Sequence, residues 1–344
     1  MTRTLAGPSA TRSMENNRAQ LYISRLRVGT DGDGVRTLVS FTGCPLDCKW
    51  CINRELRRET PDGKWYTPQE LVDELRRDHW YFVCTQGGVT FSGGEPLLRS
   101  AFIKEFCQLC DSDWRIDIET CLNVPRANLE EVLPFVSTFI VDIKDTNPTI
   151  YSRYTGKGVN DVMAAFDYLC DTGTGEYGCS VFVRVPLIPE FNTPEDVERS
   201  IETIRERYGD DFCIDRFEYV KDKTALPEPD GRRVCRVLKA IRKGLIKENG
   251  LGIVQPVCHH KGNCPGTCPS CEAELDELNR RMVDGCTPFW TMMDMDRYEK
   301  DLTFRPGMQR NDMELAGMPT PPRRLMGDVC IPEFNNNAYD DENL

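Results

Sequence analysis

Three cysteines stand close together early in the chain, at Cys44, Cys48 and Cys51. Their CxxxCxxC spacing lets one short loop present three thiolates, which can bind three irons of a [4Fe–4S] cluster and leave the fourth iron open. A zinc ion would need a fourth protein ligand nearby, and the next cysteine along the chain is Cys84. The spacing therefore favours an iron–sulfur cluster, with zinc as the alternative. Trp50, directly before the third cysteine, strengthens this interpretation.

A glycine-rich segment, Gly93-Gly94-Glu95-Pro96, follows the next expected strand. Glycines let the backbone approach a ligand closely, and exposed backbone groups there can bind the amino group of an amino-acid-like ligand. Alone, this segment would be interpreted as an ordinary turn. Because it follows a cysteine motif at the end of the preceding strand, it instead predicts a ligand site beside the cluster.

A second group of cysteines near the C-terminus comprises Cys258, Cys264, Cys268 and Cys271. Its last three members repeat the CxxxCxxC spacing. Four thiolates suit either a structural zinc site or a fully ligated auxiliary [4Fe–4S] cluster, and zinc could also recruit His259 or His260. We favour the auxiliary cluster, because the chain already carries one cluster motif, and keep the zinc site as the alternative.

Six stretches have strand patterns: Val35–Phe41, Gly88–Ser92, Arg115–Glu119, Thr138–Lys144, Ser180–Val185 and Asp215–Val220. Helical patterns lie between them, and two begin with capping residues, Thr67 with Glu70 and Thr193 with Asp196. Strands that alternate with helices predict a parallel sheet, because each return to a parallel strand needs a crossover. We therefore expect an α/β fold, a partial (β/α)6 barrel, with its chemistry at the C-terminal ends of the strands.

The chain divides by composition into four expected parts. Residues 1–20 are polar and irregular and predict a flexible N-terminal arm, and residues 21–255 form the core. Residues 256–300 form a small cysteine-rich metal-binding extension. Residues 301–344, rich in Pro, Met and Asn, lack apolar periodicity and are expected to be largely disordered.

Composition also excludes some classes of protein. The net charge of −12 argues against sequence-independent binding of nucleic acid. No apolar run approaches the roughly 18 residues of a membrane span, and the first residues lack the apolar stretch of a secretion signal. Seventeen cysteines in a chain of 344 residues therefore indicate reduced thiols or metal ligands in a cytoplasmic, anaerobic protein.

The motifs together resemble the radical SAM superfamily and, within it, the activating enzymes of glycyl radical enzymes. The resemblance covers roughly residues 21–220 and is carried by Asp31–Thr37, Gly43–Cys51, Gly87–Leu98, Asp142–Lys144, Tyr154–Gly156 and Arg184–Pro189. It implies that the open iron binds the amino and carboxylate groups of S-adenosylmethionine. One electron then releases methionine and a 5′-deoxyadenosyl radical, which abstracts hydrogen from a substrate.

The resemblance also implies roles for individual residues. Cys44, Cys48 and Cys51 would hold the catalytic cluster, and Gly93–Pro96 would hold the methionyl amino group. The remaining implied cofactor-binding residues are Trp50, Glu119, Asp142, Lys144 and Arg184. Glu119 and Asp142 would lie near the cofactor, whereas Lys144, also a candidate catalytic residue, and Arg184 would contact its carboxylate or the substrate. The alternative for these four charged residues is a set of salt bridges at strand ends.

Three positions depart from the family pattern. Ile52 stands where relatives commonly carry histidine, Glu190 replaces a usual glycine, and the sixth strand reads Phe217–Val220 where activating enzymes tend to have a Tyr-His pair. Two substrate classes therefore compete: a glycine hydrogen of a partner enzyme, or a peptide or small molecule whose modification the auxiliary cluster assists. A non-catalytic zinc-binding module is a third possibility.

The expected partners follow from the same interpretation. A low-potential flavodoxin or ferredoxin would supply the electron, and a protein or peptide would be the substrate, with no nucleic acid and no membrane involved. Outside the two motifs, Cys121 and Cys286 are candidates for hydrogen-atom donation. The other cysteines are expected to be buried apolar side chains.

Overall fold

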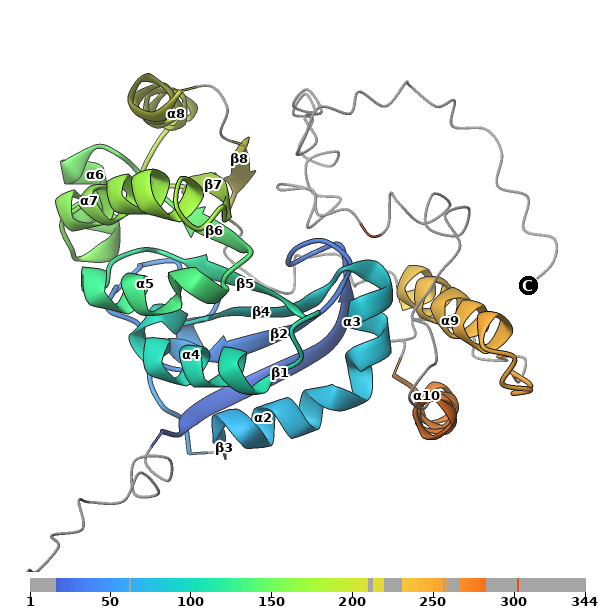
Figure 1. Ribbon diagram of the computed structural model, residues 1–344. Coiled ribbons are helices and arrows are strands. Elements are labelled where there is room, and N and C mark those ends of the chain that lie inside the picture. The colour runs from blue at the N-terminus through green and yellow to red at the C-terminus, as the bar shows by residue number, and fades with distance from the viewer. Residues whose placement is uncertain are drawn as a thin grey trace, which may run out of the picture.

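The computed structural model describes residues 17–61, 63–209, 213–219, 231–255, 258, 267–282 and 302. Within these residues, eight strands form one sheet in the order β3-β1-β2-β4-β5-β6-β7-β8 (Figure 1). The six strands from β2 to β8 pair with their neighbours in parallel. Their bounds are β2 (Val35–Phe41), β4 (Gly88–Gly93), β5 (Arg115–Thr120), β6 (Thr138–Asp142), β7 (Ser180–Leu187) and β8 (Cys213–Glu218). The expected mostly parallel α/β sheet is confirmed.

Two antiparallel strands, β1 (Ala19–Val28) and β3 (Lys64–Tyr66), extend the sheet beyond β2 and were not expected from the sequence. The start of β1 lies inside the stretch expected to be an irregular arm, so that boundary moves to residue 18. A register shift between Ser24 and Arg27, with Leu26 at a φ of 57°, interrupts the period-two pattern of β1. This interruption hides the strand from a pattern-based reading.

Helices connect the parallel strands, as the alternating pattern predicts. They are η1 (Arg54–Arg57), α2 (Pro68–Leu75), η2 (Arg76–Asp78), α3 (His79–Thr85), η3 (Pro96–Arg99), α4 (Ser100–Leu109), α5 (Arg126–Val132), η4 (Leu133–Phe135), α6 (Pro148–Thr155), α7 (Asn160–Tyr168), η5 (Leu169–Thr174) and α8 (Pro194–Tyr208). Both expected capping residues are confirmed, because the Thr67 and Thr193 side chains accept from the N–H groups of Glu70 and Asp196.

The main core lies between the sheet and the helices that cover one of its faces (Figure 1). Phe41 and Phe91, on neighbouring strands, contact Phe102 and Phe106 of α4, with ring centroids 5.2–5.7 Å apart. All four rings are at most 1% exposed. Burying each such side chain contributes about 1.5–3 kcal/mol. This aromatic layer therefore holds α4 against the sheet.

Of two further helices, α9 (Gly231–Glu248) lies beside α3, and α10 (Pro269–Arg281) packs against α9 and η2 (Figure 1). They form a second apolar cluster with Val35 and Tyr81. Polar contacts tie α10 to the core, since Glu272 forms ion pairs with Arg25 at 3.3 Å and with Arg77. Val35 opens β2, so the extension packs against the start of this strand, whereas the first cysteine motif follows its end.

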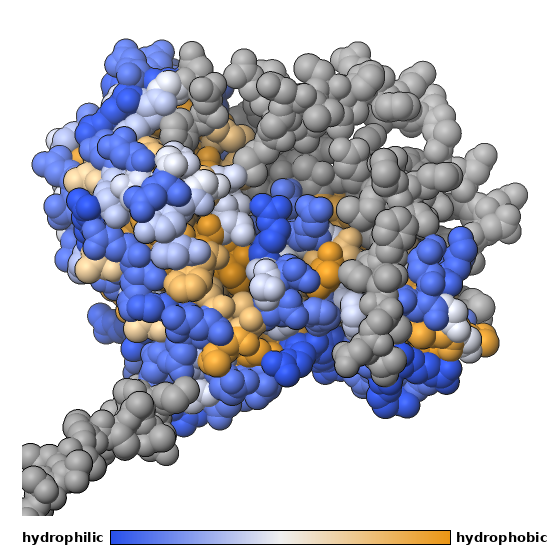
Figure 2. All heavy atoms as spheres, viewed as in Figure 1, coloured by the Kyte–Doolittle hydropathy of each residue, from blue (hydrophilic) through white to orange (hydrophobic). Residues whose placement is uncertain are grey.

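The expected C-terminal tail lies outside the described residues except for Leu302, which is 6% exposed in this second cluster and accepts a hydrogen bond from the Gly34 N–H. The viewed surface is mainly hydrophilic, with smaller apolar areas between the helices (Figure 2). None of the helices in the described residues is long and apolar enough to cross a membrane.

Candidate functional site

The loop that carries the first cysteine motif is fixed by backbone hydrogen bonds to two other segments. The Gly43 N–H donates to the Leu56 carbonyl at 2.8 Å. The Asp47 and Lys49 N–H groups donate to the carbonyls of Thr155 and Tyr154, at the end of α6. The loop is thus positioned by the core before any metal binds.

The three thiols share one cluster of side chains at the end of β2. Burial raises the pKa of the Cys48 thiol to about 12, although Lys144 opposes this effect. Burial also raises the pKa of Cys51, so iron would have to displace protons from these two thiols on binding. Within the described residues, no three Cys, His, Asp or Glu side chains converge as the ligands of one metal ion do. A four-iron cube would place each thiolate on a different iron, and three cysteine thiols are the donor set that a cluster with one open iron needs.

Cys121, which follows β5, contributes a fourth thiol to this cluster of side chains and is 8% exposed. A hydrogen bond between its thiol and that of Cys44 lowers the pKa of Cys44 and raises the pKa of Cys121. When Cys44 binds iron as a thiolate, its sulfur can only accept, so the Cys121 thiol would be the donor.

The glycine-rich segment lies directly beside the cysteine loop, because Phe41 and Gly93 are paired in the parallel register of β2 and β4. The Glu95 N–H donates to the Gly43 carbonyl at 2.8 Å. A Cβ at Gly94 would lie 2.1 Å from that same carbonyl oxygen, and Gly93 has a φ of 104°. Glycine is therefore required at both positions for the two loops to approach this closely.

The Glu95 side chain faces inward, where it is fully buried. Its carboxylate accepts from the Leu97 N–H at 3.0 Å, from the Thr120 hydroxyl at 2.8 Å and from the Cys121 N–H at 2.8 Å. These contacts join the glycine-rich loop to the turn after β5. The side chain of Glu95 is thus engaged within the protein, and the backbone of this segment is left to contact a ligand.

Charged side chains continue this edge of the sheet across β5 to β8. Arg184 forms an ion pair with Glu119 at 3.0 Å, and Ser92 donates to the same carboxylate at 2.6 Å. The register pairs Arg184 with Asp142 on one side and with Asp215 on the other. Burial alone would lower the pKa of Arg184, but Glu119, Asp142 and Asp215 raise it, so the guanidinium keeps its charge.

Lys144 lies just past the end of β6 and is 7% exposed. Its ammonium contacts the Asp142 carboxylate at 2.7 Å and the Tyr219 hydroxyl. Burial opposes the charge, but Asp142 and Tyr219 hold the pKa of Lys144 well above its usual value. The sequence did not single out Tyr219, which lies in the segment that departs from the family pattern.

Asp215 is the other site residue that the sequence did not single out. Burial raises its pKa to about 7, with Arg184 opposing this effect. Asp215 Oδ2 and Asp142 Oδ1 are buried acceptors without a hydrogen-bond partner among the described residues. Buried acceptors of this kind are costly, and hydroxyl or ammonium donors of a ligand would satisfy them. Only the parallel register, which sets Asp215 beside Arg184, identifies it.

An aromatic wall closes the other side of the cysteine loop. The Trp50 ring packs edge-on against Phe191 at 6.1 Å, and Phe191 contacts Tyr154 at 5.1 Å. The Tyr154 hydroxyl donates to the Trp50 carbonyl at 3.3 Å. Trp50 therefore supports the loop and packs in the same cluster of side chains as the thiols.

Glu190, at one departure from the family pattern, lies next to this wall. It is exposed and has a φ of 70°, a left-handed conformation that glycine adopts without strain. Arg153 donates to the carbonyls of Glu190 and Phe191 and holds the turn in place. The backbone expected for glycine is thus retained with a charged side chain.

The second cysteine group is described in part. Cys268 is the N-cap of α10, Cys271 lies in its first turn and is 8% exposed, and Cys258 is exposed. The Arg242 guanidinium of α9 lies 3.5 Å from the Cys271 sulfur. Burial raises the pKa of Cys271 to about 12, which Arg242 opposes, and both Cys268 and Cys235 of α9 raise it further. Cys264, His259, His260 and Cys286 lie outside the described residues.

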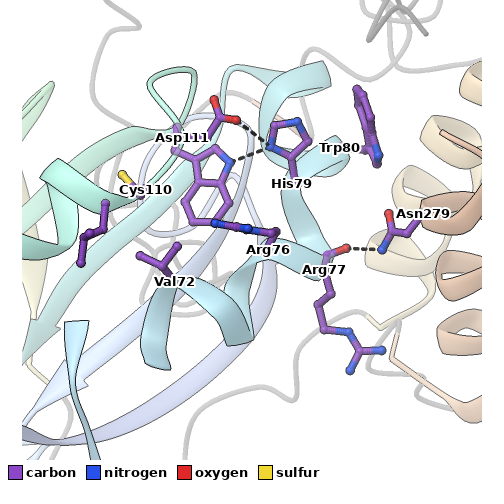
Figure 3. A pocket seen from close by; sticks show the side chains of 10 residues that line it. Val72, Arg76, Arg77, His79, Trp80, Cys110, Asp111 and Asn279 are labelled. Carbon is purple, nitrogen blue, oxygen red and sulfur yellow. Dashed lines mark hydrogen bonds and ion pairs between the residues drawn. The ribbon is translucent and has the colours of Figure 1, made fainter. Parts of the chain in front are cut away.

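A pocket of about 580 Å³ lies away from the strand ends, between α2, η2, the start of α3, the end of α4 and Asn279 of α10 (Figure 3). Trp114 Nε1 donates to His79 Nδ1 at 3.0 Å. Burial lowers the pKa of His79, which keeps the imidazole neutral as this bond requires. The Asn279 amide donates to the Arg77 carbonyl at 2.9 Å. The pocket therefore belongs to the junction between the core and α10.

Comparisons with known proteins agree with the geometry at the strand ends. A sequence model of the radical SAM superfamily matches residues 38–204. The pyruvate formate-lyase-activating enzyme of Clostridium pasteurianum is 32% identical over 180 residues, covering 51% of this chain and 71% of that enzyme. The chain belongs to the radical SAM superfamily.

Other relatives of this radical SAM enzyme also carry the names of activating enzymes. The (2S)-3-sulfopropanediol dehydratase activating enzyme of Klebsiella oxytoca is 28% identical, and the alignment covers 47% of this chain and 69% of that enzyme. A domain of a pyruvate-formate lyase-activating enzyme from Bacteroides vulgatus superposes with a TM-score of 0.34 and 21% identity, covering 44% of this chain and 93% of the domain. The similarity to activating enzymes is distant and extends over about half of the chain.

Proposed function

We propose that this radical SAM enzyme is an activating enzyme that removes a hydrogen atom from a glycine of a partner protein. In this proposal the parallel strands form a partial (β/α)6 barrel that carries the site at its C-terminal edge. The observation that carries the proposal is the register of β2 and β4, which brings the three thiols of one loop beside the glycine-rich backbone of the next.

The bound group would supply the radical chemistry. A [4Fe–4S] cluster with S-adenosylmethionine supplies, after one-electron reduction, a 5′-deoxyadenosyl radical that abstracts hydrogen. Cys44, Cys48 and Cys51 would hold three of its irons, and the fourth would be open to the cofactor's amino and carboxylate groups.

The charged residues of the strand ends would bind and orient S-adenosylmethionine. The Gly93–Pro96 backbone would accept hydrogen bonds from the amino group. Arg184 is held by Glu119, and Lys144 by Asp142, so each cation is fixed before the ligand arrives. Such prior orientation reduces the cost of binding and directs a carboxylate toward a fixed position. Trp50 and the aromatic wall would exclude water from the radical.

The partner proteins are also proposals. The names of the relatives point to a glycyl radical enzyme as the substrate, and the electron would come from a low-potential flavodoxin or ferredoxin. The enzyme would work in the cytoplasm under anaerobic conditions, without nucleic acid or membrane.

The second cysteine group favours one alternative function, the modification of a peptide or small molecule. Cys258, Cys264, Cys268 and Cys271 would bind an auxiliary [4Fe–4S] cluster, with a zinc ion as the other occupant, and Arg242 already lies against Cys271. With an auxiliary cluster, the enzyme could modify a peptide or small molecule instead of a glycyl radical enzyme. The identity of the second substrate distinguishes this alternative from the activating enzyme.

The test examines cleavage of S-adenosylmethionine and activation of a partner protein separately. Anaerobically reconstituted, reduced enzyme should convert S-adenosylmethionine into 5′-deoxyadenosine without a second substrate, and absence of this product with the cluster loaded would refute the site. Mixed with a glycyl radical enzyme from the same organism, the enzyme should produce the glycyl radical doublet in the electron paramagnetic resonance (EPR) spectrum. Cleavage of S-adenosylmethionine without this doublet would favour the peptide or small-molecule alternative.

A further inference from the structure

The turn after β5 has an unusual backbone. Leu122 is fully buried, yet its φ is 54°, in the left-handed region that a leucine rarely adopts. Such a conformation persists only where the surroundings fix it, and it is most common at functional sites. Here the Leu122 N–H donates to the Thr120 hydroxyl at 2.9 Å, and this hydroxyl donates to Glu95 at 2.8 Å.

Glu95 fixes the middle of the same turn. Its carboxylate is 0% exposed and accepts from the Cys121 N–H at 2.8 Å. The carboxylate therefore binds the turn at two consecutive residues, Thr120 and Cys121. As a result, the turn has one backbone orientation, and the glycine-rich loop that carries Glu95 determines it.

The constrained turn delivers one side chain to the proposed cluster site. The Cys121 thiol is buried in the same group of side chains as Cys44 and Cys48. A cysteine sulfur bound to iron carries no proton and can only accept, so in the loaded site a hydrogen bond between the two side chains would run from Cys121 to Cys44. Three thiols are enough for a cluster with one open iron, so Cys121 is not needed as a ligand.

We propose that Cys121 is a positioning residue that donates a hydrogen bond to the Cys44 sulfur and thereby raises the reduction potential of the cluster. This inference rests on the proposed cluster site at Cys44, Cys48 and Cys51. Reduction adds negative charge to the cluster and its sulfur ligands, and a donor aimed at one of these sulfurs stabilises the reduced form more than the oxidised form. Glu95 and the strained turn keep the donor in place in both states.

The test compares the potential of the reconstituted wild type with that of Cys121→Ala by an EPR-monitored redox titration. Alanine removes the donor, so the midpoint potential should become more negative while iron stays at about four per proposed cluster site. Cys121→Ser restores an O–H donor and should recover most of the shift. Cys84→Ala, a buried thiol in the other apolar cluster, serves as the control and should leave the potential unchanged.

A loaded Cys121→Ala cluster with the wild-type potential would overturn the inference, as would serine and alanine variants with equal shifts. If alanine prevents cluster assembly, Cys121→Val fills the space without a donor and takes its place. A wild type that binds no cluster refutes the proposed site itself. Exchange into D2O gives an independent readout, since an exchangeable proton coupled to the reduced cluster should be present in the wild type and absent in the alanine and valine variants.

Discussion

The same cysteine spacing occurs twice in this chain in very different surroundings. At the end of β2, it lies on a loop next to a glycine-rich backbone and to buried acceptors of Asp142 and Asp215 that lack partners among the described residues. In the extension, Cys268 and Cys271 start α10, and Cys271 lies against Arg242, which also contacts Tyr81 at 2.7 Å. Spacing predicts the kind of group that binds, whereas the surrounding side chains indicate what that group is for.

The two sites also differ in how completely their charges are balanced. Around α10, Glu272 and Glu274 are engaged by arginines of β1, η2 and α9. These ion pairs hold α10 on the core. The seven residues of β2 separate the start of the strand, where α9 packs, from the first cysteine loop by about 23 Å. We therefore expect the extension to stabilise the fold and the strand ends to carry the chemistry.

The largest expected difference between the two regions is in cleavage of S-adenosylmethionine. Cys48→Ala removes one of three thiolates that would hold the cluster, so formation of 5′-deoxyadenosine should fall more than about 100-fold. Cys271→Ala should change it less than about twofold, because α10 lies at the other end of β2. Anaerobic product assays with iron and zinc analysis measure both effects. Equal losses in the two variants would contradict the division of roles.

The Arg242→Ala variant tests whether the extension stabilises the fold. This arginine is 1% exposed and contacts Tyr81, Glu274 and Cys271. Removing it leaves a buried carboxylate without its partner, so the free energy of unfolding should fall by about 3 kcal/mol. Denaturant titration measures the change. Cleavage of S-adenosylmethionine without a second substrate, assayed at low temperature, should stay within about twofold of wild type. Arg216→Ala, at an exposed ion pair with Glu198, is the matched control and should cost less than about 1 kcal/mol.

A smaller effect is expected at the ligand-binding edge. Asp142→Asn removes the carboxylate that holds Lys144 and one acceptor proposed to meet the ligand. Affinity for S-adenosylmethionine should therefore fall about tenfold, which is 1.4 kcal/mol. Anaerobic calorimetry with loaded enzyme measures it. Asp167→Asn, at a surface contact with Arg207, is the matched variant, and equal affinities of the Asp142 and Asp167 variants would remove Asp142 from the site.

The alternation of strands and helices predicts the parallel part of the sheet well, since burial from both faces gives each strand an apolar run. The cysteine and glycine motifs also lie beside one another, as their shared position after neighbouring strands implies. β1 and β3 were missed because one contains a register shift and the other is three residues long. Local pattern gives no signal for either.

The roles of single side chains were harder to predict. Glu95 belongs to the glycine-rich motif, yet its carboxylate binds Thr120 and Cys121, and only the folded turn reveals this. Asp215 and Tyr219 enter the site through the register of β7 and β8 and through Lys144. These contacts join residues distant in the sequence, so no spacing rule identifies them.

The last expected effect concerns the pH dependence of stability at the strand ends. Burial raises the pKa of Asp215 to about 7, so the native state binds this proton more tightly than the unfolded chain does. The resulting stabilisation is fully present below the ordinary carboxyl pKa of about 3.9 and is lost as the pH rises through 7. Asp215→Asn has no such loss. Relative to wild type, the free energy of unfolding of the variant should rise by roughly 3–4 kcal/mol between pH 4 and pH 8, since each pKa unit corresponds to about 1.4 kcal/mol, and urea titration at both values measures the change. An identical pH dependence in the two proteins would show that Arg184 already offsets the burial of Asp215, and the strand ends would then be as fully balanced as the extension.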